Sequence, residues 1–176
     1  MHRVSIRIIA WCLAFASPLV AQSFADAQVD LPQLEAAYIF NFAQFTDWPS
    51  GRPASHVLSV CLDQDSPLGQ ALAKLDGKHA GVQTWQVRAL PRTGDAADCQ
   101  FAVLTSSTAA DAAVNGLLAS DAPVVIVSEA ATTDQGWVIA LVHEGDHLKF
   151  DINAREATRR RITLSSKLMR LARRVL

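Results

Sequence analysis

The sequence predicts a single-domain α/β protein in which helices flank one mixed β-sheet. Apolar runs typical of buried strands alternate with helical segments between residues 56 and 127, an order that favours parallel strands joined by crossover helices. Two further strand-like runs flank Gly145 and Asp146, as expected for a β-hairpin. The chain has 176 residues, of which 50% are hydrophobic, so it is long enough to bury one sizeable core.

Residues 1–27 are predicted to be a signal peptide that is cleaved from the mature protein. Arg3 and Arg7 precede an apolar run at 8–20, which is shorter than a typical membrane span, and small residues follow it. Cleavage is expected after Ser23 or Ala27, and an uncleaved membrane anchor is the alternative. The predicted domain therefore occupies residues 28–176, and export from the cytoplasm argues against nucleic acid as a partner.

Residues 31–49 carry the clearest helical pattern in the chain. Pro32 suits the first turn of a helix, and Pro49 is expected to end the helix near Asp47. Large apolar residues recur between them at intervals of three and four, which places them on one stripe of the helix: Leu31, Leu34, Tyr38, Phe42 and Phe45. This stripe is interpreted as the face that packs against the core.

The remaining elements follow from apolar runs and capping residues, taken in order. Ser66 or Asp65 is expected to cap a helix that begins at Pro67, and Ser107 or Thr108 to cap an alanine-rich helix that ends at Leu118. The predicted strands are 56–62, 82–90, 101–104 and 123–127, followed by the hairpin strands 137–143 and 147–152.

Two helices are expected after the hairpin. Asn153 can cap a short helix that runs to Arg160, and Ser165 or Ser166 can cap a final helix. In that final helix an apolar stripe is predicted to face the core, formed by Leu168, Leu171, Ala172 and Val175. Three basic residues are predicted to form its exposed face: Lys167, Arg170 and Arg174.

Basic residues are concentrated at the end of the chain. Residues 155–176 contain eight basic residues and one acidic residue, whereas residues 28–154 contain 6 basic and 15 acidic residues. Such a basic end is suited to an acidic partner, an anionic membrane surface or a phosphate. Neutralisation of the acidic body of the domain is the alternative. If the end contacts a partner, we expect Lys167, Arg170 and Arg174 to make the contact.

One string in the predicted hairpin matches a zinc protease signature. His143-Glu144-Gly145-Asp146-His147 has the form HExxH, which requires both histidines on one face of a helix. The glycine and the flanking β-branched runs oppose a helix here, so a zinc hydrolase that uses His143 and His147 is the least favoured function. The chain has no nucleophile elbow, Walker loop or dinucleotide-binding motif. No catalytic residue, metal site or cofactor is therefore predicted, and we do not expect an enzyme.

Two further pairs of residues are less specific. Asp63 and Asp65 follow a predicted strand, where α/β folds often bind ligands, but two carboxylates at this place are more typical of turn and cap residues. Cys61 and Cys99 are the cysteines that remain after cleavage. In an oxidising compartment they would form a disulfide that closes a loop of 38 residues, and two separate buried thiols are the alternative.

Taken together, segments of the chain resemble the YfiR family of periplasmic regulators (YfiR/HmsC, or domain of unknown function 4154). The resemblance covers nearly the whole mature chain in order, with YIFNFAQFTDWP at 38–49, SPLGQALAKLDGK at 66–78, ADCQFAVL at 97–104, GWVIALV at 136–142, LKFDIN at 148–153 and LSSKLMRLARRVL at 164–176. The F-x-x-W-P element at 45–49 and the ending F-x-I-N…L-x-x-L-A-R, at 150–153 and 168–173, are fairly specific when they occur together.

The resemblance implies a non-enzymatic inhibitor with a mixed α/β fold, often dimeric. It implies that the protein binds the periplasmic sensor domain of an inner-membrane diguanylate cyclase, and so lowers cyclic di-GMP and with it biofilm and exopolysaccharide output. An OmpA-like outer-membrane lipoprotein would sequester the regulator. A periplasmic adaptor or ligand-binding protein for another sensor, such as a histidine kinase, is the alternative.

The resemblance also bears on individual residues. Cys61 and Cys99 fall where the family often has a disulfide, whereas a second cysteine pair near the hairpin is absent, so redox control through that pair is not expected. The resemblance implies a ligand site in the best-known member that is built from basic and imidazole side chains. At the corresponding positions this chain has Asp47 and Ser165 instead. Binding of a small molecule at that site is therefore not carried over to this chain.

Overall fold

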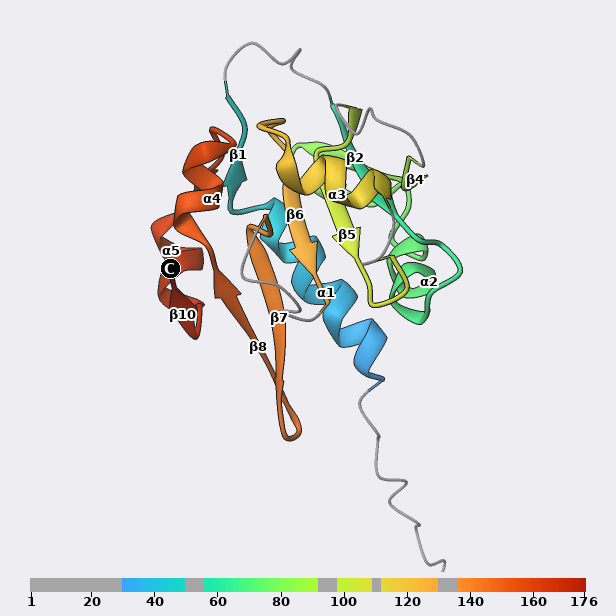
Figure 1. Cartoon of the computed structure of the whole chain (residues 1–176). Helices are drawn as coiled ribbons and strands as arrows, with labels where there is room; N and C mark the ends of the chain where they lie inside the picture. The colour runs from blue at the N-terminus through green and yellow to red at the C-terminus, as the bar shows by residue number, and fades with distance from the viewer. Residues whose placement is uncertain (1–29, 50–55, 92–97, 109–111, 130–135) are drawn as a thin grey trace, which may run out of the picture.

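The structure is a computed structural model that describes residues 30–49, 56–91, 98–108, 112–129 and 136–176. Within these residues one mixed eight-stranded β-sheet runs through the domain, with helices on both faces, and a separate two-stranded sheet lies beside it (Figure 1). The predicted fold class, an α/β domain with a mixed sheet flanked by helices, is confirmed. The predicted signal peptide lies outside the described residues. None of the described helices has both the length and the apolar character needed to cross a membrane.

The sheet has the strand order β10-β8-β7-β6-β5-β2-β4-β3. Its parallel centre consists of β2 (Val57–Leu62), β4 (Gln83–Ala89), β5 (Phe101–Leu104) and β6 (Val125–Ser128). The antiparallel hairpin of β7 (Ile139–Glu144) and β8 (His147–Ile152) follows it, and the short strands β3 (His79–Ala80) and β10 (Arg174–Val175) form the two edges. Strands β2, β5 and β6 are buried on both faces, which is why their sequences are nearly continuous apolar runs, whereas β4 lies nearer the edge and buries Trp85 alone.

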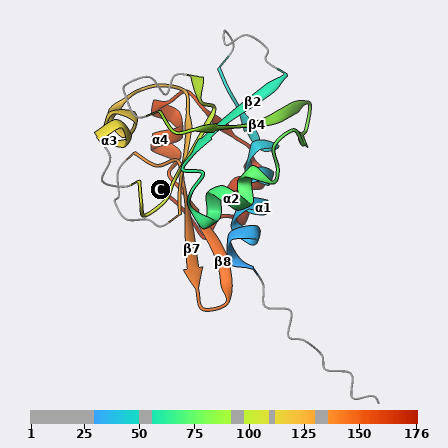
Figure 2. The same ribbon diagram turned by 90° about the vertical axis from the view of Figure 1, so that its right-hand side faces the viewer.

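Two helical layers cover the sheet (Figure 2). Helices α1 (Leu31–Ala43) and α2 (Pro67–Ala73) lie on one face, and α3 (Ala112–Ala119) lies on the other. The larger hydrophobic core lies under α1 and α2 and includes Trp85 and Phe101. The smaller core lies under α3 and includes Trp137 and both cysteines.

Helix α1 ends earlier than the position of Pro49 predicts. The helix stops at Ala43, and Thr46–Asp47 form strand β1, which pairs with β9 (Thr163–Leu164). The Thr46 hydroxyl donates a hydrogen bond of 2.8 Å to the Phe42 carbonyl, which also accepts a hydrogen bond of 3.0 Å from the Phe45 amide at the helix end. The chain therefore leaves the helix because a distant strand offers it a partner.

The buried face of α1 also differs from the predicted stripe. Ala36, Ile39 and Phe42 are its most buried apolar residues, whereas most of the predicted stripe is only partly buried and Leu31 is exposed. The predicted stripe packs against the core at Phe42 and, partly buried, at Leu34, Tyr38 and Phe45, but the helix carries apolar residues on more than one side, and its most buried side also includes Ala36 and Ile39. The partly buried side forms the wall of a groove that is described below.

The predicted final helix is shorter than expected. Helix α5 covers Ser166–Leu171 and is capped by Ser165, as predicted, but it does not continue to the end of the chain. Arg174 and Val175 instead form the edge strand β10, parallel to β8. Leu168 is buried, whereas Leu171 and Val175 are 69% and 48% exposed, so the predicted apolar stripe does not face the core as a whole.

The predicted turns and most of the predicted caps are found in the structure. Ser66 caps α2 and Asn153 caps α4 (Ala154–Arg159), each by accepting a hydrogen bond from a backbone amide three residues later. Gly145 adopts a positive φ of 59° in the turn between β7 and β8, a conformation that glycine adopts without steric cost. The predicted start of α3 borders residues 109–111, which lie outside the described residues.

Candidate functional site: an aromatic groove between α1, β8 and α5

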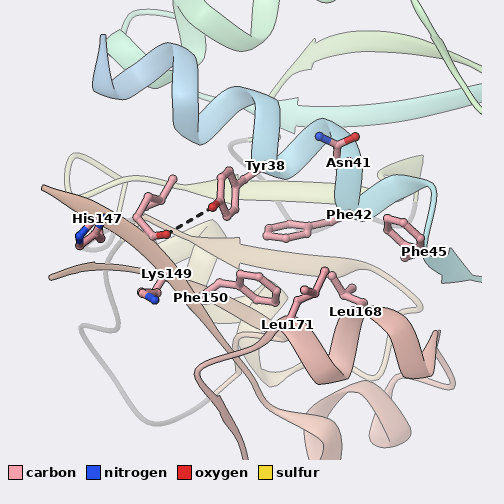
Figure 3. Close-up of a pocket in the computed structure, with 10 residues that line it drawn as sticks. Tyr38, Asn41, Phe42, Phe45, His147, Lys149, Phe150, Leu168 and Leu171 are labelled. Atoms are coloured by element: carbon pink, nitrogen blue, oxygen red, sulfur yellow. Dashed lines mark hydrogen bonds between the residues drawn. The ribbon is translucent and has the colours of Figure 1, made fainter. Parts of the chain in front are cut away.

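A groove of about 500 Å³ separates α1 from the β7–β8 hairpin and from α5. Figure 3 shows side chains from the three elements directed toward one another across it. The residues that line this aromatic groove are Tyr38, Asn41, Phe42, Phe45, His147, Leu148, Lys149, Phe150, Leu168 and Leu171. It is therefore built from one local segment, residues 38–45, and from two segments that lie more than 100 residues further along the chain.

Packed aromatic rings form the floor of the groove. The rings of Phe42 and Phe150 lie 4.9 Å apart, and Tyr38 meets each of them edge-on at 6.3 Å between ring centroids. The Tyr38 hydroxyl donates a hydrogen bond of 3.4 Å to the carbonyl of Leu148, which joins α1 to β8. Edge-to-face and tilted contacts of this kind stabilise a ring cluster beyond its buried area. The groove is thus a preformed apolar surface.

The rim of the groove is polar and cationic. His147 and Lys149 are exposed residues of β8, and they lie on the hairpin side of the groove (Figure 3). Leu171 forms part of the opposite rim and is 69% exposed. An apolar floor with an exposed leucine and a polar rim is typical of a surface that binds another protein.

The structure separates the three basic residues that the sequence groups together. Lys167 and Arg170 are exposed on α5, where each is next in sequence to a leucine that lines the groove, and within the described part of the chain they make no ion pair. Arg174 is not on that helix: it lies in β10 and its guanidinium binds the buried carboxylate of Asp151 at 2.7 Å. The prediction that all three form one exposed helix face is wrong, because the helix ends before Arg174.

Asp151 ties the C-terminal segment to the sheet. Its side chain is fully buried in β8 and accepts hydrogen bonds from both Arg173, at 2.6 Å, and Arg174. The hydrogen bonds from Arg173, together with those from Arg174, lower the pKa of Asp151 to about 2, although burial acts in the opposite direction. Arg173 also binds Glu144 of β7 at 2.7 Å. These contacts hold the segment after α5 in place.

Among the described residues, four of the eight basic residues in 155–176 form ion pairs within the domain. Arg159 and Arg160 bind Glu156, and Arg160 is fully buried where its guanidinium also donates to carbonyls at the end of α3. Together with Arg173 and Arg174 they account for four of the eight basic residues of this segment. Neutralisation of carboxylates within the domain therefore accounts for some of the basic residues at the end of the chain. It does not account for Lys167 and Arg170, which are in none of these ion pairs.

The two histidines of the HExxH string lie on opposite strands of the hairpin, so the helix that zinc chemistry would need is absent from this segment. His143 Nε2 lies 2.8 Å from Oε1 of Glu35 in α1, whereas His147 lines the groove. No group of three or more His, Cys, Asp or Glu residues that could hold a metal ion is found in the part of the chain that the structure describes.

The other candidate residues take structural positions. Asp63 accepts hydrogen bonds from the Asp65 amide, at 3.1 Å, and from the Ser107 hydroxyl, at 2.8 Å, at the C-terminal ends of β2 and β5. These residues line a second hollow of about 460 Å³.

Cys61 of β2 and Cys99, which precedes β5, form a buried disulfide with a Cα–Cα distance of 5.8 Å. Of the two alternatives for these cysteines, the structure contains the disulfide.

Sequence analysis missed two functional features, for different reasons. The groove could not be found because its walls meet only through the fold, although the cluster of aromatic residues in 38–45 was a signal. Glu35 was passed over because a single acidic residue on an apolar helix is usually solvated. In the structure Glu35 lies one helical turn before the fully buried Ile39, so both side chains face inward, and no pattern in the sequence singled out that side of the helix.

Comparison with known proteins adds the family to this geometry. A family model described as YfiR/HmsC-like, DUF4154, matches residues 32–173. None of the curated proteins that were compared with the sequence matches it significantly. The matched region includes α1, the whole eight-stranded sheet except its last strand, and α5, so it contains every element that lines the aromatic groove. The chain belongs to the YfiR/HmsC-like family.

Proposed function

We propose that this protein is a periplasmic regulator that binds the sensor domain of an inner-membrane diguanylate cyclase and represses the synthesis of cyclic di-GMP. Membership of the YfiR/HmsC-like family over residues 32–173 is the observation that carries this proposal. Repression would lower biofilm and exopolysaccharide output. An OmpA-like outer-membrane lipoprotein would relieve the repression by sequestering the regulator. The signal-peptide pattern of residues 1–27 supports the periplasm as the compartment.

Repression requires the regulator to discriminate between two states of its partner. A ligand that binds both states equally shifts no equilibrium, so the regulator must bind the inactive sensor domain more tightly than the active one. A hundredfold shift of that equilibrium corresponds to about 2.7 kcal/mol of differential affinity. One well-formed apolar contact with flanking charges can supply a difference of this size.

We propose the aromatic groove, with Lys167 and Arg170 beside it, as the surface that makes this contact. Leu171 and the aromatic floor supply apolar surface, and hot spots of protein interfaces are typically apolar or aromatic anchors in such pockets. Lys167 precedes Leu171 by four residues on α5, so the two side chains project from the same side of the helix. An acidic segment of the partner with an apolar anchor fits this combination.

The first experiment measures intracellular cyclic di-GMP in the native cell after the gene is deleted and then restored. A repressor predicts a rise on deletion that is reversed on restoration. No change under several growth conditions would contradict repression of a cyclase, and would favour an adaptor for another sensor, such as a histidine kinase.

Binding of the purified protein to the cyclase's periplasmic domain tests the groove. We expect Leu171→Asp, and separately the pair Lys167→Glu and Arg170→Glu, to weaken binding at least tenfold, about 1.4 kcal/mol, and the charge-reversed pair also to change the salt dependence. Arg155→Glu is the matched control, because Arg155 is exposed on α4 and within the described residues makes no ion pair.

Unchanged affinity in both groove variants would rule out this docking surface, while the deletion experiment tests repression independently. Arg174→Glu is not a suitable probe of docking. This substitution places a carboxylate next to the buried carboxylate of Asp151, so any loss of binding would be mixed with a loss of stability.

A further inference from the structure

The order of the parallel strands creates a topological switch point between β2 and β5. From β2 the chain passes through α2, on one face of the sheet, to β4 on one side of β2 (Figure 2). From β5 it passes through α3, on the opposite face, to β6 on the other side. In open α/β sheets the loops at the carboxyl ends of two such strands diverge and leave a crevice, and these folds bind their ligands there.

A hollow of about 460 Å³ lies at this switch point. It is lined by residues 62–65 at the end of β2, by residues 107 and 108 after β5, and by residues 89 and 90 at the end of β4. These are the carboxyl ends of three neighbouring parallel strands. Small-molecule sites usually have volumes of about 300–1,000 Å³. None of these residues lines the aromatic groove, so this switch-point hollow is a separate feature.

Two carboxylates give the switch-point hollow an acidic wall. Asp63 is held in place, because it accepts hydrogen bonds from the Ser107 hydroxyl and from the Asp65 amide. The side chains of Asp65 and Gln64 are exposed, and among the described residues no group bonds to them. None of the residues that line the hollow, all of which the structure describes, is basic. The wall therefore favours a cation over an anion.

The rest of the lining is partly apolar, which favours an organic cation. Leu62 and Ala89 end their strands, and Leu90 follows as a half-buried residue. A short alkyl chain suits this surface, because burial of methylene groups is favourable. A bare metal ion suits it less, because hard cations need several oxygen ligands and no group of three or more His, Cys, Asp or Glu residues that could hold a metal is found among the described residues.

We propose that the switch-point hollow binds a small alkylammonium compound, whose ammonium group contacts the carboxylates of Asp63 and Asp65 and whose alkyl chain contacts Ala89 and Leu90. Asp63 supplies an acceptor of fixed orientation, because its own hydrogen bonds hold it. Asp65 supplies a second carboxylate, which makes no ion pair within the described residues. The argument uses only the topology and the lining of the hollow, so it goes beyond the proposed function and does not rest on it.

Nuclear magnetic resonance of the purified mature protein, with putrescine as the probe, tests this site. At constant ionic strength we expect the amide signals of Asp65 and Ser107, which lie on two different loops, to shift together and to saturate at millimolar concentration or below. Asp65→Asn removes the exposed carboxylate and should weaken putrescine binding by about three- to fivefold. Ala89→Phe keeps every charge but places a ring in the hollow, and should weaken binding by about tenfold or more.

Asp146→Asn is the matched control, because Asp146 is exposed at the tip of the β7–β8 hairpin and lines neither the hollow nor the groove. Equal weakening in Asp65→Asn and Asp146→Asn would indicate a general attraction of amines to acidic residues and would overturn the proposal. An absence of saturable shifts, or equally strong binding of the neutral molecule D-glucose, would also overturn it. The titration needs no partner protein. Saturable binding together with unchanged cyclic di-GMP on gene deletion would support this site and contradict only the proposed function.

Discussion

Glu35 and Asp151 are both buried acidic residues, but their surroundings have opposite effects. Asp151 accepts hydrogen bonds from two guanidinium groups, which hold its pKa at about 2, so it stays ionised at any physiological pH. Within the described residues Glu35 is paired with the imidazole of His143, and burial together with Glu129 raises the pKa of Glu35. Asp151 therefore favours its ionised form, whereas the surroundings of Glu35 favour the protonated carboxyl group.

At Asp151 we expect the substitution Asp151→Asn to lower the free energy of unfolding by about 1–2 kcal/mol at neutral pH. The figure is less than the full pKa shift implies, because both arginines are partly solvated. Because the folded-state pKa is depressed, this stability is present above the ordinary pKa of 3.8 and is lost as the pH falls toward 2. Urea unfolding of the two proteins across that range checks the prediction. An unfolding difference that does not shrink in acid would contradict it.

The start of helix α2 depends on a close approach between the backbone at Gly69 and the carbonyl of Asp63 at the end of β2. The Ser66 hydroxyl donates to the Asp63 carbonyl and accepts from the Gly69 amide, so the chain folds back tightly after the strand. A Cβ atom at Gly69 would lie only 1.9 Å from that same Asp63 carbonyl oxygen. Only glycine can occupy this position without displacing the backbone of the turn.

We therefore expect Gly69→Ala to lower the free energy of unfolding by about 1–3 kcal/mol, because the overlap is with backbone rather than with a flexible side chain. Gly116→Ala is the matched control within α3. A Cβ atom there meets nothing within 4 Å, so this substitution should raise stability by up to about 1 kcal/mol through helix propensity. Thermal unfolding of both variants measures the difference, and equal midpoints would show that the turn can relax at little cost.

At the scale of the whole molecule, the core is divided by the sheet into two parts. The disulfide lies in the smaller part, under α3, and joins β2 to the segment that enters β5. These strands are neighbours in the sheet although the chain visits α2, β3 and β4 between them. The disulfide therefore ties together the two ends of the chain segment that connects β2 to its parallel neighbour β5.

Reduction of the Cys61–Cys99 disulfide should lower the free energy of unfolding by about 2–4 kcal/mol, as expected for a loop of 38 residues. Urea unfolding with and without a reducing agent measures this effect. The double variant Cys61→Ala and Cys99→Ala is the control and should not respond to the reductant. An unchanged midpoint on complete reduction of the native protein would show that the folded layers alone fix this crossover.

The sequence by itself determined the order and type of most elements. Continuous apolar runs identified the buried strands, Ser66, Asn153 and Ser165 identified three helix starts, and Gly145 identified the hairpin turn. These features are local, because a capping side chain bonds to an amide three residues away and a buried strand needs apolar residues at every position. The family resemblance was also visible in the sequence, because its motifs are strings of adjacent residues.

The tertiary structure decided where α1 and α5 end and what the basic residues contact. After the end of α1, Thr46 pairs with Leu164 in a short strand. After the end of α5, Arg174 binds Asp151, which lies 23 residues earlier in the chain. The aromatic groove and the Glu35–His143 contact likewise join residues that are far apart in sequence. A helical pattern reports only which side of a segment is apolar. Strand pairing and ion pairing depend on partners that the fold brings close, so no local pattern could specify them.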